Sequence, residues 1–191
     1  VKVVGVTGSD YLGADLYSSA IVDIVTAGLV DKDGKTVRDY ALALDKSGRL
    51  FGWGTNYHGV VDPAEEKGKV ITRPVEISAK TPTLGNALTL SSDKIAANAR
   101  ILRKDGQVMT WGQNDEEHKA YGGYSLEETP DRAILGGRAL EVNGGVYNAV
   151  AVTTAGQVKT WGGTNDGEYD TRFANGVRDI IIPVGEQVID E

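Results

Sequence analysis

The sequence predicts an all-β protein built from repeated sheets, and two observations carry this prediction. All three tryptophans of the 191 residues stand in the same context, five residues after one glycine and one before another, at Trp53, Trp111 and Trp161. The repeats are therefore 58 and 50 residues apart. Upstream of each first glycine, apolar positions recur while the residues between them vary in charge, which is typical of strands with one better-buried face.

Each repeat is predicted to hold one hairpin preceded by a further strand. The hairpins pair 39–45 with 49–54, 97–103 with 107–112, and 147–153 with 157–162. Their turns place Gly48, Gly106 and Gly156 where a positive φ is needed. The preceding strands are predicted at 21–27, 87–90 and 139–142. No segment has a convincing helical period, and only 63–67 could hold one short turn.

Sheets this small cannot cover their own apolar faces, so they must pack against neighbours. The predicted fold is therefore a β-propeller with repeats of 50 to 58 residues, three complete blades and two half-blades at the ends. Each tryptophan is expected in the core of its blade. The glycine after it, Gly54, Gly112 or Gly162, is expected to let a neighbouring backbone approach closely.

Both ends of the chain extend the repeat. Residues 8–13 match 54–59 position by position, and 177–185 resemble 21–28. Residues 1–191 are thus predicted to form one propeller domain or part of one, with a blade tail, three blades and a blade head. These segments are 1–19, 20–80, 81–135, 136–176 and 177–191. Three arrangements remain open: a fragment of a longer propeller, a ring assembled from several chains, and a small four-bladed ring.

Segments 149–162 and 104–114 carry a more specific resemblance. They resemble the repeat of the regulator of chromosome condensation family, whose blades have the form ALT-x-DG-x-VY-x-WG-x-N-xx-G, and the likeness extends over about residues 20–182. It implies a ring closed by strands from both termini. Two features depart from the family: Tyr40, Asn98 and Asn148 replace its usual histidine, and the Gly-Gln-Leu-Gly segment is largely lost. The chain therefore resembles the diverged bacterial and phage relatives.

Composition excludes several classes of partner and site. The net charge of −7 opposes binding to nucleic acid and to anionic membrane surfaces. Without cysteine the chain has no disulfide, thiolate nucleophile or cysteine-bound metal. It has neither an apolar run of membrane-spanning length nor a visible signal peptide. An opening Val1 and a final Ile189-Asp-Glu191 suggest processing of the kind that phage head proteins undergo.

No catalytic, cofactor-binding or metal-binding constellation is predicted. The two histidines are read as solvated loop residues, and the run 114–118 is too sequential to converge on one metal ion. Segment 27–36 ends in Gly-Lys-Thr but has five residues between its glycines, one more than a phosphate loop, and no predicted helix follows. Within it, the run 31–34 reaches its glycine two positions too early for a calcium loop, and Leu42 stands where the bidentate glutamate should be. We therefore expect that the protein is not an enzyme.

Variation concentrates in the loops after each Trp-Gly pair, at 55–69, 113–128 and 163–175. Variable polar and aromatic loops on a fixed scaffold commonly form binding surfaces. The predicted contact residues are Asn56, Tyr57, His58, Asn114, His118, Tyr121, Tyr124, Asn165, Asp166 and Tyr169.

The predicted function is protein recognition or structural assembly, in a phage particle or at a bacterial surface. Copies of the chain itself or other virion or surface proteins are the expected partners. A carbohydrate-binding lectin propeller and a guanine-nucleotide exchange factor are the alternatives.

Overall fold

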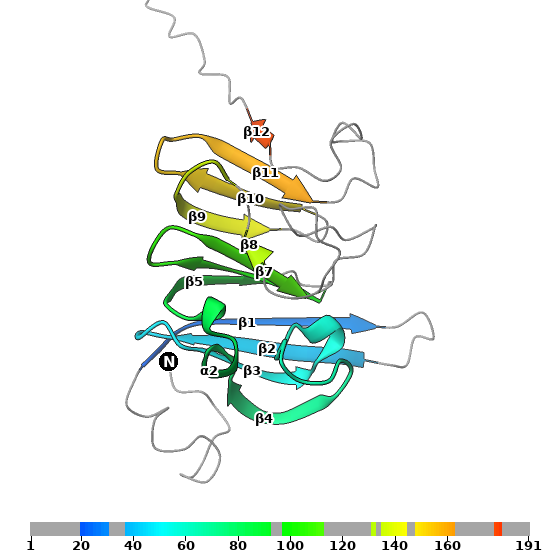
Figure 1. The fold of residues 1–191 in the computed structure, drawn as a ribbon. Coiled ribbons are helices and arrows are strands. Elements are labelled where there is room, and N and C mark those ends of the chain that lie inside the picture. The colour runs from blue at the N-terminus through cyan, green and yellow to red at the C-terminus, as the bar shows by residue number, and fades with distance from the viewer. Residues whose placement is uncertain are drawn as a thin grey trace, which may run out of the picture.

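The computed structural model describes residues 20–30, 37–92, 97–112, 131–132, 135–144, 148–162 and 178–180. These residues form three antiparallel sheets of four strands each, which follow one another through the molecule in chain order (Figure 1). The all-β prediction is confirmed, and so are the three tryptophan-bearing hairpins.

In all three sheets the strands lie in sequence order, so strands that pair are neighbours in the chain. The first sheet comprises β1 (Ile21–Val30), β2 (Val37–Asp45), β3 (Leu50–Thr55) and β4 (Val70–Glu76). The second comprises β5 (Ala87–Ser92), β6 (Asn98–Arg103), β7 (Val108–Gly112) and β8 (Asp131–Arg132). The third comprises β9 (Ala139–Gly144), β10 (Asn148–Thr153), β11 (Val158–Gly162) and β12 (Arg178–Ile180).

The fourth strand of each sheet was not predicted, and the last of them changes a blade boundary. Residues 178–180 pair with β11, with Ile180 opposite Val158, so they complete the third sheet instead of opening a following blade. The sequence missed β8 and β12 because two or three residues are too few to show alternation. In β4, Pro74 weakened the strand pattern, although proline is tolerated on an edge strand such as this one.

Helical structure is confined to short connections in the described residues. The elements are η1 (Tyr57–Gly59), α2 (Ile77–Lys80) and η2 (Pro82–Leu84). With four residues, α2 is the longest of them, far below the length needed to cross a bilayer.

The apolar core lies between consecutive sheets. One face of the first sheet, including Leu42 and Leu44, packs against Ile101 and Trp111 of the second. The opposite face of the second sheet, with Leu102 and Val108, belongs to another core with Trp161 of the third. In the second and third sheets, the face that carries the tryptophan packs against the preceding sheet. The three sheets therefore stack in the same orientation.

Backbone hydrogen bonds repeat the same relation at the hairpin turns. The carbonyl of Gly48 accepts from the amide of Ala87 at 3.1 Å, and the carbonyl of Gly106 accepts from Ala139 at 2.8 Å. Each turn of one sheet is thereby joined to the first strand of the next. Both glycines have positive φ, 92° and 80°, as the sequence predicted.

The glycines after Trp53 and Trp111 are required by the pairing within their own sheets. Gly54 and Gly112 have φ of 105° and 102°, and a Cβ atom there would collide with the carbonyl oxygens of Asp39 and Ala97. A close backbone approach was predicted, but it comes from the paired strand of the same sheet. These glycines therefore set the end of the hairpin.

Candidate protein-interaction site

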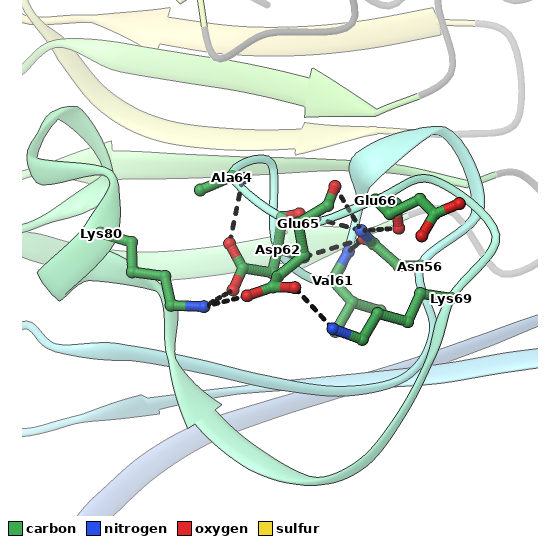
Figure 2. A network of polar contacts seen from close by, with 8 residues as sticks. All are labelled: Asn56, Val61, Asp62, Ala64, Glu65, Glu66, Lys69 and Lys80. Atoms are coloured by element: carbon green, nitrogen blue, oxygen red, sulfur yellow. Dashed lines mark hydrogen bonds and ion pairs between the residues drawn. The ribbon is translucent and has the colours of Figure 1, made fainter.

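Asn56 organises the loop that joins β3 to β4. Its side chain is fully buried, and its Nδ2 donates to the carbonyls of Asp62 at 2.9 Å, Glu66 at 3.1 Å and Glu65 at 3.3 Å. Its Oδ1 accepts from the amides of Val61 and Asp62, at 3.0 and 2.9 Å (Figure 2). One amide side chain thus satisfies backbone groups across residues 61–66 and fixes the conformation of the loop.

The prediction that Asn56 contacts a partner is therefore wrong, because its side chain is enclosed by its own loop. A signal for this role was present in the sequence. Asn56 and Asn114 both stand three residues after a tryptophan, and a position that recurs in phase with the core is better explained by structure than by binding.

A cluster of charges joins the same loop to α2, with Asp62 buried and Lys69, Lys80 and Glu65 partly or more exposed. Lys80 Nζ is 3.0 Å from Asp62 and 2.6 Å from Glu65, and Lys69 Nζ is 2.7 Å from the other oxygen of Glu65 (Figure 2). Hydrogen bonds from Lys69 and then Lys80 lower the pKa of Glu65 to about 2. The bond to Glu65, followed by that to Asp62, raises the pKa of Lys80. The cluster ties α2 to the loop.

Tyr57 and His58 remain partly exposed at the tip of this loop. Their rings meet edge to face with centroids 4.1 Å apart, and Tyr57 also packs on the first core. His58 has a φ of 52°, an uncommon conformation for a residue other than glycine. The other predicted contact residues lie outside the described residues: Asn114, His118, Tyr121, Tyr124, Asn165, Asp166 and Tyr169.

A second surface, which the sequence analysis missed, lies at the start of the first strand of every sheet. There the pairing register shifts, and in each sheet one apolar residue has no residue opposite it on the neighbouring strand. The three residues, hereafter the apolar row, are Val22, Leu88 and Leu140. They are 56%, 54% and 60% exposed, although each is flanked by strand residues that pair normally.

The residues of the apolar row come from strands that contact one another, because β5 touches both β1 and β9. The amide of Leu90 donates to Asp23 at 3.2 Å, which joins β5 to β1. Ser91 donates to Asn143 Oδ1 at 3.4 Å, which joins β5 to β9. A signal was available here too: an apolar pair opens each strand and breaks the strict alternation, at 21–22, 87–88 and 139–140.

Among the described residues, no group of three or more histidine, aspartate or glutamate side chains is placed to hold a metal ion. The apolar row presents apolar surface, and the loop between β3 and β4 presents aromatic and charged groups.

Comparison with known proteins supports the repeat seen in the sequence. No family model matches the chain. Protein pim1 of Schizosaccharomyces pombe is 26% identical over 167 residues, which cover 75% of this chain and 29% of that protein. The E3 ubiquitin-protein ligase HERC2 of Homo sapiens is 27% identical over 131 residues, covering 65% of this chain and 2% of the ligase. The chain thus spans less than a third of these curated relatives.

Two solved structures share the fold. Human WBSCR16 superimposes with a TM-score of 0.60 at 14% identity, over 84% of this chain and 38% of that one. Prp20p of Saccharomyces cerevisiae gives a TM-score of 0.58 at 16% identity, over 91% of this chain and 51% of that one. Sequence repeat, sheet packing and structural likeness agree on the fold: the chain has the sheet arrangement of a β-propeller, and its repeats resemble those of the regulator of chromosome condensation.

Proposed function

We propose that this chain is a protein-recognition module that acts by binding and not by catalysis, with the apolar row as the centre of its contact surface. The observation that carries the proposal is the exposure of Val22, Leu88 and Leu140 at equivalent positions in three sheets. The relative Prp20p has been characterised by its binding to Gsp1p and histones, so a related propeller binds proteins.

Exposed apolar residues scattered singly need no explanation, but these three recur in phase on adjacent strands. In each sheet a bulge turns the side chain out of the ladder, and bulges commonly re-aim a side chain for function. Burying the exposed half of each side chain under a partner would contribute about 1 kcal/mol, so the three together would contribute about 3 kcal/mol. That is a useful centre for an interface, provided that polar contacts surround it.

The proposal is tested by the double substitution Leu88→Asp with Leu140→Asp. Val70→Asp is the matched control, because Val70 is 60% exposed on the outer strand β4 and lies outside the apolar row. The three proteins are used for affinity capture from the source organism, with quantification by mass spectrometry and circular dichroism to verify folding. We expect a protein that wild type and Val70→Asp retain and the double variant loses. Equal capture by all three would contradict the proposal.

The location and the alternative functions predicted from the sequence can also be tested. A location in a phage particle or at a bacterial surface is tested by quantifying the chain in purified particles and envelope fractions. Binding to a glycan array, or acceleration of nucleotide release from a small GTPase, would instead support one of the two alternative functions.

A further inference from the structure

The first sheet presents a face that its counterparts bury. The face, hereafter the head face, comprises the paired residues Ile24, Ala41, Ala43, Phe51 and Trp53. Ile24 is 44% exposed and Trp53 is partly exposed. In the second and third sheets the residues in phase with Ile24 are Leu90 and Val142, and the preceding sheet buries both. Trp111 and Trp161 are buried in the same way, so the head face has the residues of a covered face and is partly open.

The open part of the head face lies around Ile24 and Trp53. Phe51, on the same face, has the guanidinium of Arg49 over its ring, 5.5 Å from the ring centroid. That part of the face is therefore closed by residues of the first sheet itself.

The third sheet presents the complementary face at the other end of the stack (Figure 1). Register places Val150, Val152 and Val158 on it, hereafter the tail face, and all three are half-buried. The second sheet has a face of the same kind, which packs on the third sheet. Its in-phase residues are fully or almost fully buried: Arg100, Leu102 and Val108.

The residues of both end faces are those of an interface between sheets. Repeats that stack in series contact only their neighbours, and a stack that ends in water needs a polar outer face. Here the head face offers an isoleucine and an indole, and the tail face offers three valines. Covering these side chains would remove apolar surface from water, which favours association.

The hairpin turns differ in the same sense. A Cβ atom at Gly48 would lie 2.9 Å from the carbonyl oxygen of Ala87, and one at Gly106 would lie 2.7 Å from Cβ of Arg138. Both neighbours belong to the start of the next sheet. At Gly156 no described atom lies within 4 Å of the same position. The turn of the third sheet therefore has room for the first strand of another sheet.

We propose that the tail face of one molecule packs on the head face of a second copy, in the arrangement that already joins the first sheet to the second and the second to the third. Both interfaces within the chain bring a tryptophan-bearing face against the opposite face of the preceding sheet, which shows that the two kinds of face are complementary. In the new contact the carbonyl of Gly156 accepts from the amide of Ile21 of the second copy, as the carbonyl of Gly48 does from Ala87. Because the two faces differ, the contact is heterologous, and its repetition closes a ring or continues as a filament.

The test blocks one face at a time in the full chain. Ile24→Arg places a charge on the head face, and Val152→Arg places one on the tail face. Leu88→Arg is the matched control, because Leu88 is exposed in the second sheet and belongs to neither face. Mass is measured by multi-angle light scattering and native mass spectrometry over a concentration series, with circular dichroism to verify folding. Val158→Arg replaces Val152→Arg if the latter does not fold.

We expect wild type and Leu88→Arg to form multimers, and each blocking variant to remain a monomer. An equimolar mixture of the two blocking variants should give dimers and nothing larger, because the intact tail face of Ile24→Arg meets the intact head face of Val152→Arg. A monomeric wild type would overturn the proposal, as would a mixture that stays monomeric. Self-association of either blocking variant alone would also overturn it, because it would show that like faces meet.

Discussion

The first and second sheets place the same residue in the same local geometry and give it different surroundings. Trp53 pairs with Ala41 and Trp111 with Ala99, and each is followed by a glycine with φ near 100°. Only Trp111 is fully buried, under the loop that contains Val60. The hairpin therefore determines where the indole points, and the preceding sheet determines whether it is buried.

The largest expected difference between the two sheets is in the effect of removing the indole. Trp111→Ala should lower the free energy of unfolding by about 3–5 kcal/mol, because it leaves a cavity and an unpaired buried carbonyl. Trp53→Ala should lower it by about 1–2 kcal/mol, since that side chain is already partly exposed. Chemical denaturation of both variants measures the two values. Equal losses would show that burial by the preceding sheet contributes little.

Asn56→Ala should have the next largest effect, about 2–4 kcal/mol, because five hydrogen bonds to buried or part-buried backbone groups are lost. The matched control is Thr72→Ala, at an exposed position on β4. Thermal unfolding of the two variants gives the comparison. A loss for Asn56→Ala no greater than that of the control would mean that the loop keeps its conformation without this side chain.

The glycines after the tryptophans should behave alike in both sheets, in contrast to the tryptophans. Gly54→Ala and Gly112→Ala should each lower the free energy of unfolding by about 2–3 kcal/mol, because both combine positive φ with a collision. Gly68 also has positive φ, 81°, but faces open space. Gly68→Ala should therefore lower it by about 1 kcal/mol. Markedly unequal values for Gly54 and Gly112 in denaturant titrations would contradict the local equivalence of the hairpins.

The smallest expected effect concerns the charged cluster of the first loop. The pKa of Glu65 is lowered in the folded state from 4.5 to about 2, so its contribution to stability is present above pH 4.5 and is lost as the pH falls toward 2. Glu65→Gln removes this contribution. The difference in melting temperature between wild type and variant should thus shrink over that interval, more visibly at low ionic strength. A constant difference would exclude a role for the Glu65 charge.

Much of the fold was predictable because the residues that recur in every repeat are those that pack in the core or form the turns. The tryptophans, the turn glycines and the hairpin register follow from spacing alone. The fourth strands were missed because their pairing depends on a neighbouring strand more than on their own short sequences. Arg178–Ile180 even resembles the opening of a blade, yet it pairs at the far edge of the third sheet.

The candidate site was less predictable, for two physical reasons. Asn56 is polar and lies in a variable loop, so it resembled a contact residue until its partners proved to be backbone groups of that loop. The apolar row depends on bulges, and a bulge reverses which side of the strand a residue faces. Composition alone predicts that Leu88 and Leu140 are buried.

Hydrogen exchange at the indole nitrogens is the most direct test of the claim that the loop of one sheet fixes the indole of the next. We predict that Asn56→Ala, a change in the first sheet, accelerates exchange at Trp111 Nε1 in the second sheet and leaves Trp161 at its wild-type rate. Unchanged exchange at Trp111 in a variant that remains folded would contradict the account.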